Sequence, residues 1–141
     1  MTVMTDFRAV VKARLATIFP DVNWVDGKLD GGPNVTRQEL GCIFPDSELE
    51  SEDTTYLNLG VVVRMFKRTA DVAARATEPT QPRDPAPLEA WAETLRTSLD
   101  DIQVGAGGTW YFRVSGIEYD MDQYAFEAAI FGRGENPFQT F

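Results

Sequence analysis

Apolar and polar residues alternate along four parts of the chain, with two different periods. Apolar residues recur every three or four positions over residues 6–19 and 88–101, which predicts two amphipathic helices. Residues 55–67 and 109–132 alternate every second position instead, which predicts a long strand and a C-terminal hairpin. Pro20 directly follows the first periodic segment and is typical of a helix end.

The segments between these elements have compositions typical of loops. Residues 45–53 contain five carboxylates, and repulsion between them favours a solvated acidic loop. Residues 76–87 contain four prolines, which predicts an extended linker. Residues 133–141 form a tail that ends in Phe138 and Phe141, and these rings pack either on their own domain or on a neighbour.

The order of elements fits a single domain over residues 1–141. We expect an α+β fold, in which a small antiparallel β-sheet has two α-helices packed on one face. Residues 22–35 carry glycine-centred turn signals around short extended pieces, which predicts a loop or a frayed edge strand. Both faces of the predicted hairpin carry large apolar groups, so the face opposite the helices is either covered within the monomer or meets another copy.

Composition narrows the chemistry that this chain can perform. It has no histidine, which removes an imidazole base and the usual mixed zinc site. Its single cysteine, Cys42, cannot form an intramolecular disulfide and lies in apolar company that favours a buried thiol. We therefore expect no enzyme activity, no cofactor and no bound metal.

Charge and hydropathy restrict the classes of partner that this chain can bind. With 22 acidic and 13 basic residues the formal net charge is −9, which opposes binding to nucleic-acid phosphates through a basic surface. No segment approaches the roughly 20 apolar residues that span a bilayer, and the first ten residues lack the pattern of a signal peptide. We expect a soluble protein that stays in the compartment where it is made, with no membrane partner.

Carboxylates are the only plentiful group with catalytic potential. Glu118, Asp120 and Asp122 alternate across the tip of the predicted hairpin, where a hard cation such as magnesium or calcium is one reading. A solvated hairpin tip is the reading that we favour. For the acidic loop 45–53, solvation again leads, and a charged docking surface is the alternative.

Basic residues cluster at the end of the long strand, whereas the acidic run lies just before its start. The cluster contains Arg64, Lys67, Arg68 and Arg75. The ends of a strand of about ten residues lie roughly 30 Å apart, too far to pair within one molecule. One hypothesis is that the acidic end of one copy meets the basic end of the next in a head-to-tail ring, so that charge reversal at Arg64 and Arg68 weakens self-association. Ordinary surface charges are an equally good interpretation.

The sequence resembles the tail terminator, or tail-completion, proteins of long-tailed bacteriophages and the related head–tail joining proteins. The resemblance is one of pattern and has no signature motif. It spans most of the chain through 7-FRAVVKARLATIFP-20, 56-YLNLGVVVRMF-66, the passage into 88-LEAWAETLRTSL-99, and 110-WYFRVSGIEYDMDQYAFEAAIFG-132.

This resemblance implies a structural virion protein that forms a ring, typically a hexamer, at the head-proximal end of a tail tube. The ring ends tube polymerisation and joins the tail to the head, with the tail-tube protein and the head–tail connector protein as partners. DNA passes through without specific binding, and an acidic lumen suits that passage. The implied location is the head–tail junction of the virion, and the host cytoplasm during assembly.

Two other classes of function remain open. An acidic protein–protein interaction module, such as a secretion chaperone or a nucleic-acid mimic, fits the charge and the lack of catalytic groups. A small enzyme or ligand-binding sheet that uses carboxylates is the third reading.

The residues that we select come from the pattern and not from family motifs. The candidates for subunit or partner contacts are Tyr56, Asn58, Arg64, Phe66, Arg68, Tyr111, Arg113, Phe138 and Phe141. The candidates for an acidic loop or lumen are Glu48, Glu50, Glu52, Asp53, Glu118, Asp120 and Asp122.

Overall fold

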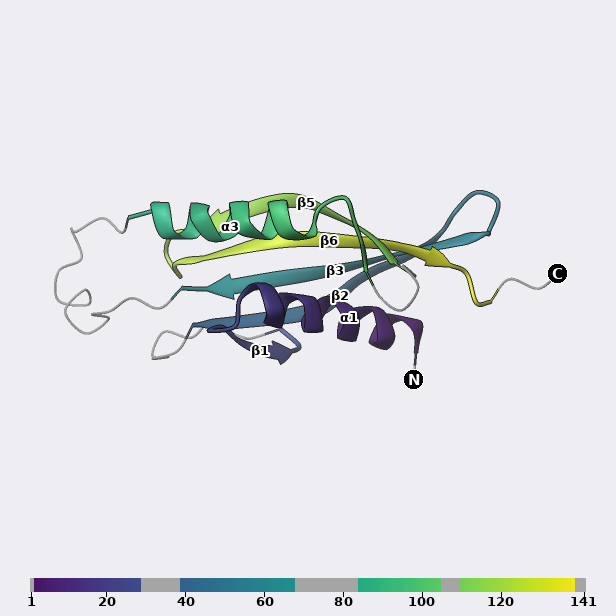
Figure 1. The fold of residues 1–141 in the computed structure, drawn as a ribbon, viewed down its shortest axis with the longest axis horizontal. Helices are drawn as coiled ribbons and strands as arrows, with labels where there is room; N and C mark the ends of the chain where they lie inside the picture. Colours follow the sequence, from purple (N-terminus) through teal and green to yellow (C-terminus); the bar gives the residue numbers. More distant parts are fainter. Residues whose placement is uncertain (1, 29–38, 68–83, 105–109, 139–141) are drawn as a thin grey trace.

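The structure, a computed structural model, describes residues 2–28, 39–67, 84–104 and 110–138 (Figure 1). Two helices and six strands occur in these ranges. In chain order they are α1 (Val3–Ile18), β1 (Asn23–Asp26), β2 (Leu40–Glu50), β3 (Tyr56–Phe66), α3 (Ala86–Leu99), β4 (Ile102–Val104), β5 (Trp110–Asp120) and β6 (Ala125–Glu135).

The six strands form one sheet in the order β1-β2-β3-β6-β5-β4. Strand β1 runs parallel to β2, and every other neighbouring pair is antiparallel. The α+β class is therefore confirmed in outline, whereas the expectation of an antiparallel sheet is wrong at this edge. The frayed edge strand expected within residues 22–35 is β1, and its parallel pairing was not visible because periodicity carries no strand direction.

Both helices pack on the same face of the sheet, as Figure 1 shows. The Thr2 hydroxyl caps α1 by accepting a hydrogen bond from the Thr5 amide at 3.0 Å. Proline in the first turn starts α3. Each helix buries one apolar stripe, as the spacing predicted: Met4, Phe7, Val11 and Leu15 on α1, and Leu88, Ala92, Leu95 and Leu99 on α3.

Phe7 of α1 is a central core residue that reaches β5 and β6. The Phe7 ring is fully buried and packs against Trp110 and Phe112, with ring centroids 5.0 and 5.6 Å apart. Its ring also lies on Gly132 of β6, where a Cβ atom would overlap it. The expected core face of β3 is confirmed as well: Leu57, Leu59, Val61, Val63 and Met65 are all buried.

The acidic segment 45–53 is not a loop over its whole length, so that expectation is wrong. Strand β2 continues through Glu50, and residues 51–55 make the turn into β3. Pairing of Leu49 with Asn58 and of Glu50 with Leu57 supplies backbone hydrogen bonds, while the carboxylates stay in solvent. A strand can therefore be highly acidic where it extends beyond the helices, and Figure 1 shows this hairpin projecting at the right.

Other boundaries move by a few residues. The first helix begins at residue 3, and β6 continues to Glu135, into the segment expected as a tail. Most of the expected linker 76–87 lies outside the described residues, although α3 begins within its last two positions. The long strand and the terminal hairpin are confirmed as β3, β5 and β6.

Asp100 joins the end of α3 to β5. Its Oδ1 accepts hydrogen bonds from the Val114 amide at 2.9 Å and from Arg113 Nε at 3.0 Å. The Val114 amide, with help from Arg113, lowers the pKa of Asp100 below its usual value.

We expect Asp100→Asn to lower the free energy of unfolding by about 1 kcal/mol at neutral pH, because the amide keeps the acceptor but loses the charge. The pKa of Asp100 is lower in the folded state, so its stabilisation is present above the unfolded pKa and is lost as the pH falls through the folded pKa. Urea unfolding of both proteins across the acid range should show the difference shrinking as the pH falls below the ordinary aspartate pKa of 3.8. A difference independent of pH would contradict the role of the charge.

Candidate functional site

The sheet face opposite the helices, hereafter the open face, carries exposed apolar groups near the β2–β3 turn. Leu49 is 63% exposed, Tyr56 38% and Phe131 37%. Strand pairing sets Leu49 opposite Asn58, and Phe131 opposite Gly60. Large exposed apolar groups that share one face of a sheet are typical of a contact surface for another protein.

A bulge and a glycine shape this part of the open face. The β2 register shifts between Pro45 and Ser47, opposite Gly60. A Cβ at Gly60 would meet Ser47 Oγ at 2.6 Å and the Phe131 ring at 3.0 Å, so the glycine permits this close approach. A glycine within a strand is typical of a bulge or of the close approach of another backbone. The structure shows a bulge opposite Gly60, and the groups that approach it closely are the Ser47 and Phe131 side chains.

An ionic network lies on the open face beside the β5–β6 turn. Arg64 on β3 donates to Asp120 Oδ2 at 2.9 Å and to Glu127 Oε1 at 3.1 Å, and also to Gln123. The Arg64 side chain is only 16% exposed and lies over the Phe66 ring, 5.2 Å from its centroid. Arg64 is therefore neutralised within its own molecule.

This network corrects the hypothesis of a free basic cluster at the end of the long strand. Arg64 is paired within the molecule, and Lys67 Nζ lies 2.9 Å from Glu39 Oε1. Lys67 also lies 4.2 Å from the centre of the Trp91 ring. Arg68 and Arg75, the other two members of the cluster, lie outside the described residues.

The selected contact residues differ in exposure. Tyr56 is exposed with the Arg133 guanidinium 4.2 Å from its ring centre, and Asn58 on β3 and Tyr111 on β5 are half-buried. Phe66 is buried with Cys42 and Ala125, so it is not part of the exposed surface.

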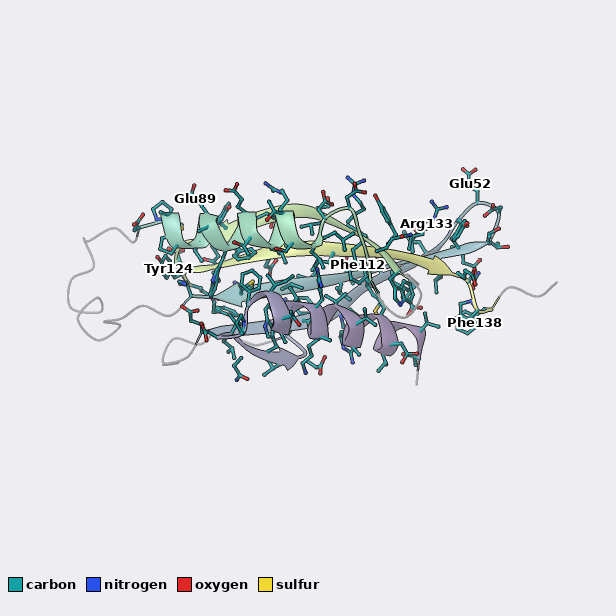
Figure 2. All side chains as sticks on the ribbon, viewed as in Figure 1. Glu52, Glu89, Phe112, Tyr124, Arg133 and Phe138 are labelled. Carbon is teal, nitrogen blue, oxygen red and sulfur yellow. The ribbon has the colours of Figure 1, made fainter. Side chains whose placement is uncertain are left out.

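The other selected residues lie at the edges of the open face or beyond it. Arg113 is exposed and bound to Asp100. Phe138 is 68% exposed, and Figure 2 shows it at the same end of the molecule as Glu52. Phe141 lies outside the described residues.

The acidic candidates separate into two places. Glu48, Glu50, Glu52 and Asp53 are all exposed on the β2–β3 hairpin. At the tip of the β5–β6 hairpin, Asp120 turns to Arg64, while Glu118 and Asp122 are exposed. Within the described ranges, no group of three or more histidine, cysteine, aspartate or glutamate side chains is placed to hold a metal ion.

Sequence reasoning missed a groove between α1 and β1. It has a volume of about 540 Å³ and is lined by Thr5, Arg8, Ala9, Lys12, Ala13, Ala16, Val22, Trp24 and Asp26. Its apolar part combines the alanines of α1 with Val22 and Trp24 of the edge segment. The Trp24 ring lies flat on Gly41 of β2, since a Cβ there would overlap it. The sequence signal that could have revealed the groove is the spacing of Ala9, Ala13 and Ala16, which places three small residues on one face of α1.

Two cations and one carboxylate lie at the rim of this groove. Arg8 Nε lies 3.0 Å from Asp26 Oδ1, and Lys12 Nζ lies 2.9 Å from Asp26 Oδ2. The hydrogen bond from Lys12, with that from Arg8, lowers the pKa of Asp26 below its usual value. One carboxylate shared by two cations leaves the rim with one positive charge in excess.

The sequence matches no model of a known protein family, and a comparison with curated proteins finds no match either. Among the residues that the structure describes, no helix has both the length and the apolar character needed to cross a membrane.

Proposed function

We propose that this protein is a tail terminator of a long-tailed bacteriophage, a ring-forming virion protein that ends growth of the tail tube and joins the tail to the head connector. The observation that carries the proposal is the open face. It presents Leu49, Tyr56 and Phe131 to solvent on a sheet whose other face packs against two helices. Such a surface fits a protein that works by contacting other proteins.

The charge supports the same proposal. A formal net charge of −9 opposes contact with DNA phosphates, as a ring through which DNA passes requires. The exposed carboxylates of the β2–β3 hairpin are candidates for facing that passage. The open face is then the surface for the tail-tube protein or the connector.

Genetics in the phage that encodes the protein tests this function. A nonsense mutation in the gene should yield full heads that are not joined to tails, and tails of uncontrolled length, both visible by electron microscopy. Tails of normal length joined to heads would contradict the proposal. A purified protein that forms only a stable dimer would instead favour an acidic interaction module.

Complementation of that mutant tests the open face. We expect Tyr56→Ser with Phe131→Ser to give at least about tenfold fewer infectious particles than wild type, because each lost apolar contact weakens binding. Tyr119→Ser is the matched control, since Tyr119 is 47% exposed and packs on Phe126, which belongs to the main core beneath the helices. Equal yields from the two variants, at equal melting temperatures, would remove the open face from the proposal.

A further inference from the structure

We infer that the end of the β2–β3 hairpin of one copy docks into the groove between α1 and β1 of a second copy. This inference rests on the proposed function, because the ring supplies the second copy. It names the two surfaces that meet at each subunit contact. Leu49 is used in this contact, and Tyr56 and Phe131 of the open face remain for the tube or the connector.

The apolar parts of the two surfaces match. Leu49 is the most exposed apolar side chain of the strands, at 63%, and lies near the end of β2. The groove offers an apolar surface made by Ala13, Ala16 and Trp24. Because the helix side of the groove is built from alanines, α1 places no long side chain in this part. Strand β1 is an edge strand, so the groove lies at the margin of the sheet, where a second copy has access.

The charges also match. Glu48 and Glu50 flank Leu49 in sequence and are exposed on the opposite face of β2, and Glu52 and Asp53 are exposed in the turn that follows. Among the residues that the structure describes, Arg8 and Lys12 at the rim of the groove share one carboxylate, that of Asp26. A hairpin rich in carboxylates therefore meets a rim with excess positive charge, and this complementarity selects the hairpin over a basic partner.

Distance excludes the same contact within one molecule. Trp24 at the groove pairs in register with Gly41 of β2, and Leu49 lies eight residues further along that strand. Eight residues of extended strand span about 26 Å, well beyond the reach of a side chain. The two surfaces are also different, so the contact is heterologous and each copy offers one of each. Repeated contacts of this kind make a closed ring when the rotation between copies closes.

Cysteine cross-linking between two single variants tests the contact. We expect an oxidised mixture of Leu49→Cys and Ala13→Cys proteins to form a disulfide-linked dimer at least about tenfold faster than either protein alone, because docking raises the effective thiol concentration. The matched control replaces Ala13→Cys with Ala90→Cys, since Ala90 is an exposed alanine on the other helix, α3. Native Cys42 is buried, so wild-type protein measures the background.

Light scattering during size-exclusion chromatography supplies a second readout. Leu49→Ser should weaken self-association by about tenfold or more, with an unchanged melting temperature, because the side chain is exposed in the monomer. Rings that persist in Leu49→Ser, or a cross-linking rate equal to that of the Ala90→Cys control, would overturn the inference. Either result would leave the proposed function standing, because that is judged separately by the lengths and joining of mutant tails.

Discussion

Replacing Phe7 with alanine should lower the free energy of unfolding by about 3–5 kcal/mol, the largest single effect that we expect. The Phe7 ring is fully buried between Trp110 and Phe112 and rests on Gly132. Its removal leaves a cavity at the point where α1 is held against the sheet. Urea unfolding followed by circular dichroism measures the loss.

A double-mutant cycle with Gly132→Ala isolates the contact between helix and strand. Alone, Gly132→Ala should cost about 1–3 kcal/mol, because the new methyl group overlaps the Phe7 ring. In the Phe7→Ala background the same methyl group enters the vacated space. The double variant should therefore lose at least about 1 kcal/mol less than the sum of the losses in the two single variants.

Gly41→Ala serves as the control for this cycle, because a Cβ at Gly41 meets Trp24 instead of Phe7. Its loss should add to that of Phe7→Ala within about 0.5 kcal/mol. Phe7→Leu replaces Phe7→Ala if the double variants do not fold. Additive losses for Phe7 and Gly132 would show that the ring does not rest on this glycine in solution.

Replacing Arg64 with methionine should lower the free energy of unfolding by about 2–3 kcal/mol, between the values typical of exposed and of buried ion pairs. Methionine keeps an apolar stem over Phe66 but leaves Asp120 and Glu127 without their cation. The Arg64 side chain is 16% exposed, whereas these carboxylates are 38% and 35% exposed. Water can therefore replace only part of the stabilisation that the carboxylates receive from Arg64. Unfolding in urea measures this loss as well.

Two further variants separate charge from packing. Arg133→Ala removes an exposed cation that lies over Tyr56 on the same face, and it should cost less than about 1 kcal/mol. Glu127→Gln in the Arg64→Met background should recover part of the loss, because one unpaired charge disappears. No recovery, with equal losses for Arg64 and Arg133, would mean that the network does not stabilise the fold.

The network also changes how the sequence is to be interpreted. Arg64 belonged to a basic cluster that we expected to meet an acidic neighbour, and it is instead paired with carboxylates more than 50 positions away in the sequence, as the separations of 56 and 63 residues show. The carboxylates of the β2–β3 hairpin stay exposed. The cations that we propose as their partners are Arg8 and Lys12 on α1, for which the sequence pattern made no prediction.

The sequence by itself determined the elements with a clear period. The helical stripes of α1 and α3, the buried face of β3 and the terminal hairpin follow from local spacing, which one short segment is enough to reveal. The lack of histidine and the acidic composition likewise restricted the chemistry before any fold was known.

Only the tertiary structure decided which elements are neighbours. The parallel pairing of β1 with β2, the continuation of β2 to Glu50 and the groove beside Trp24 each depend on register between segments distant in sequence. Residue spacing records which face of an element is apolar, but it contains no information about which other element covers that face. Pairing partners and charge partners are set by packing of the whole chain, and the candidate contact surfaces emerge only at that level.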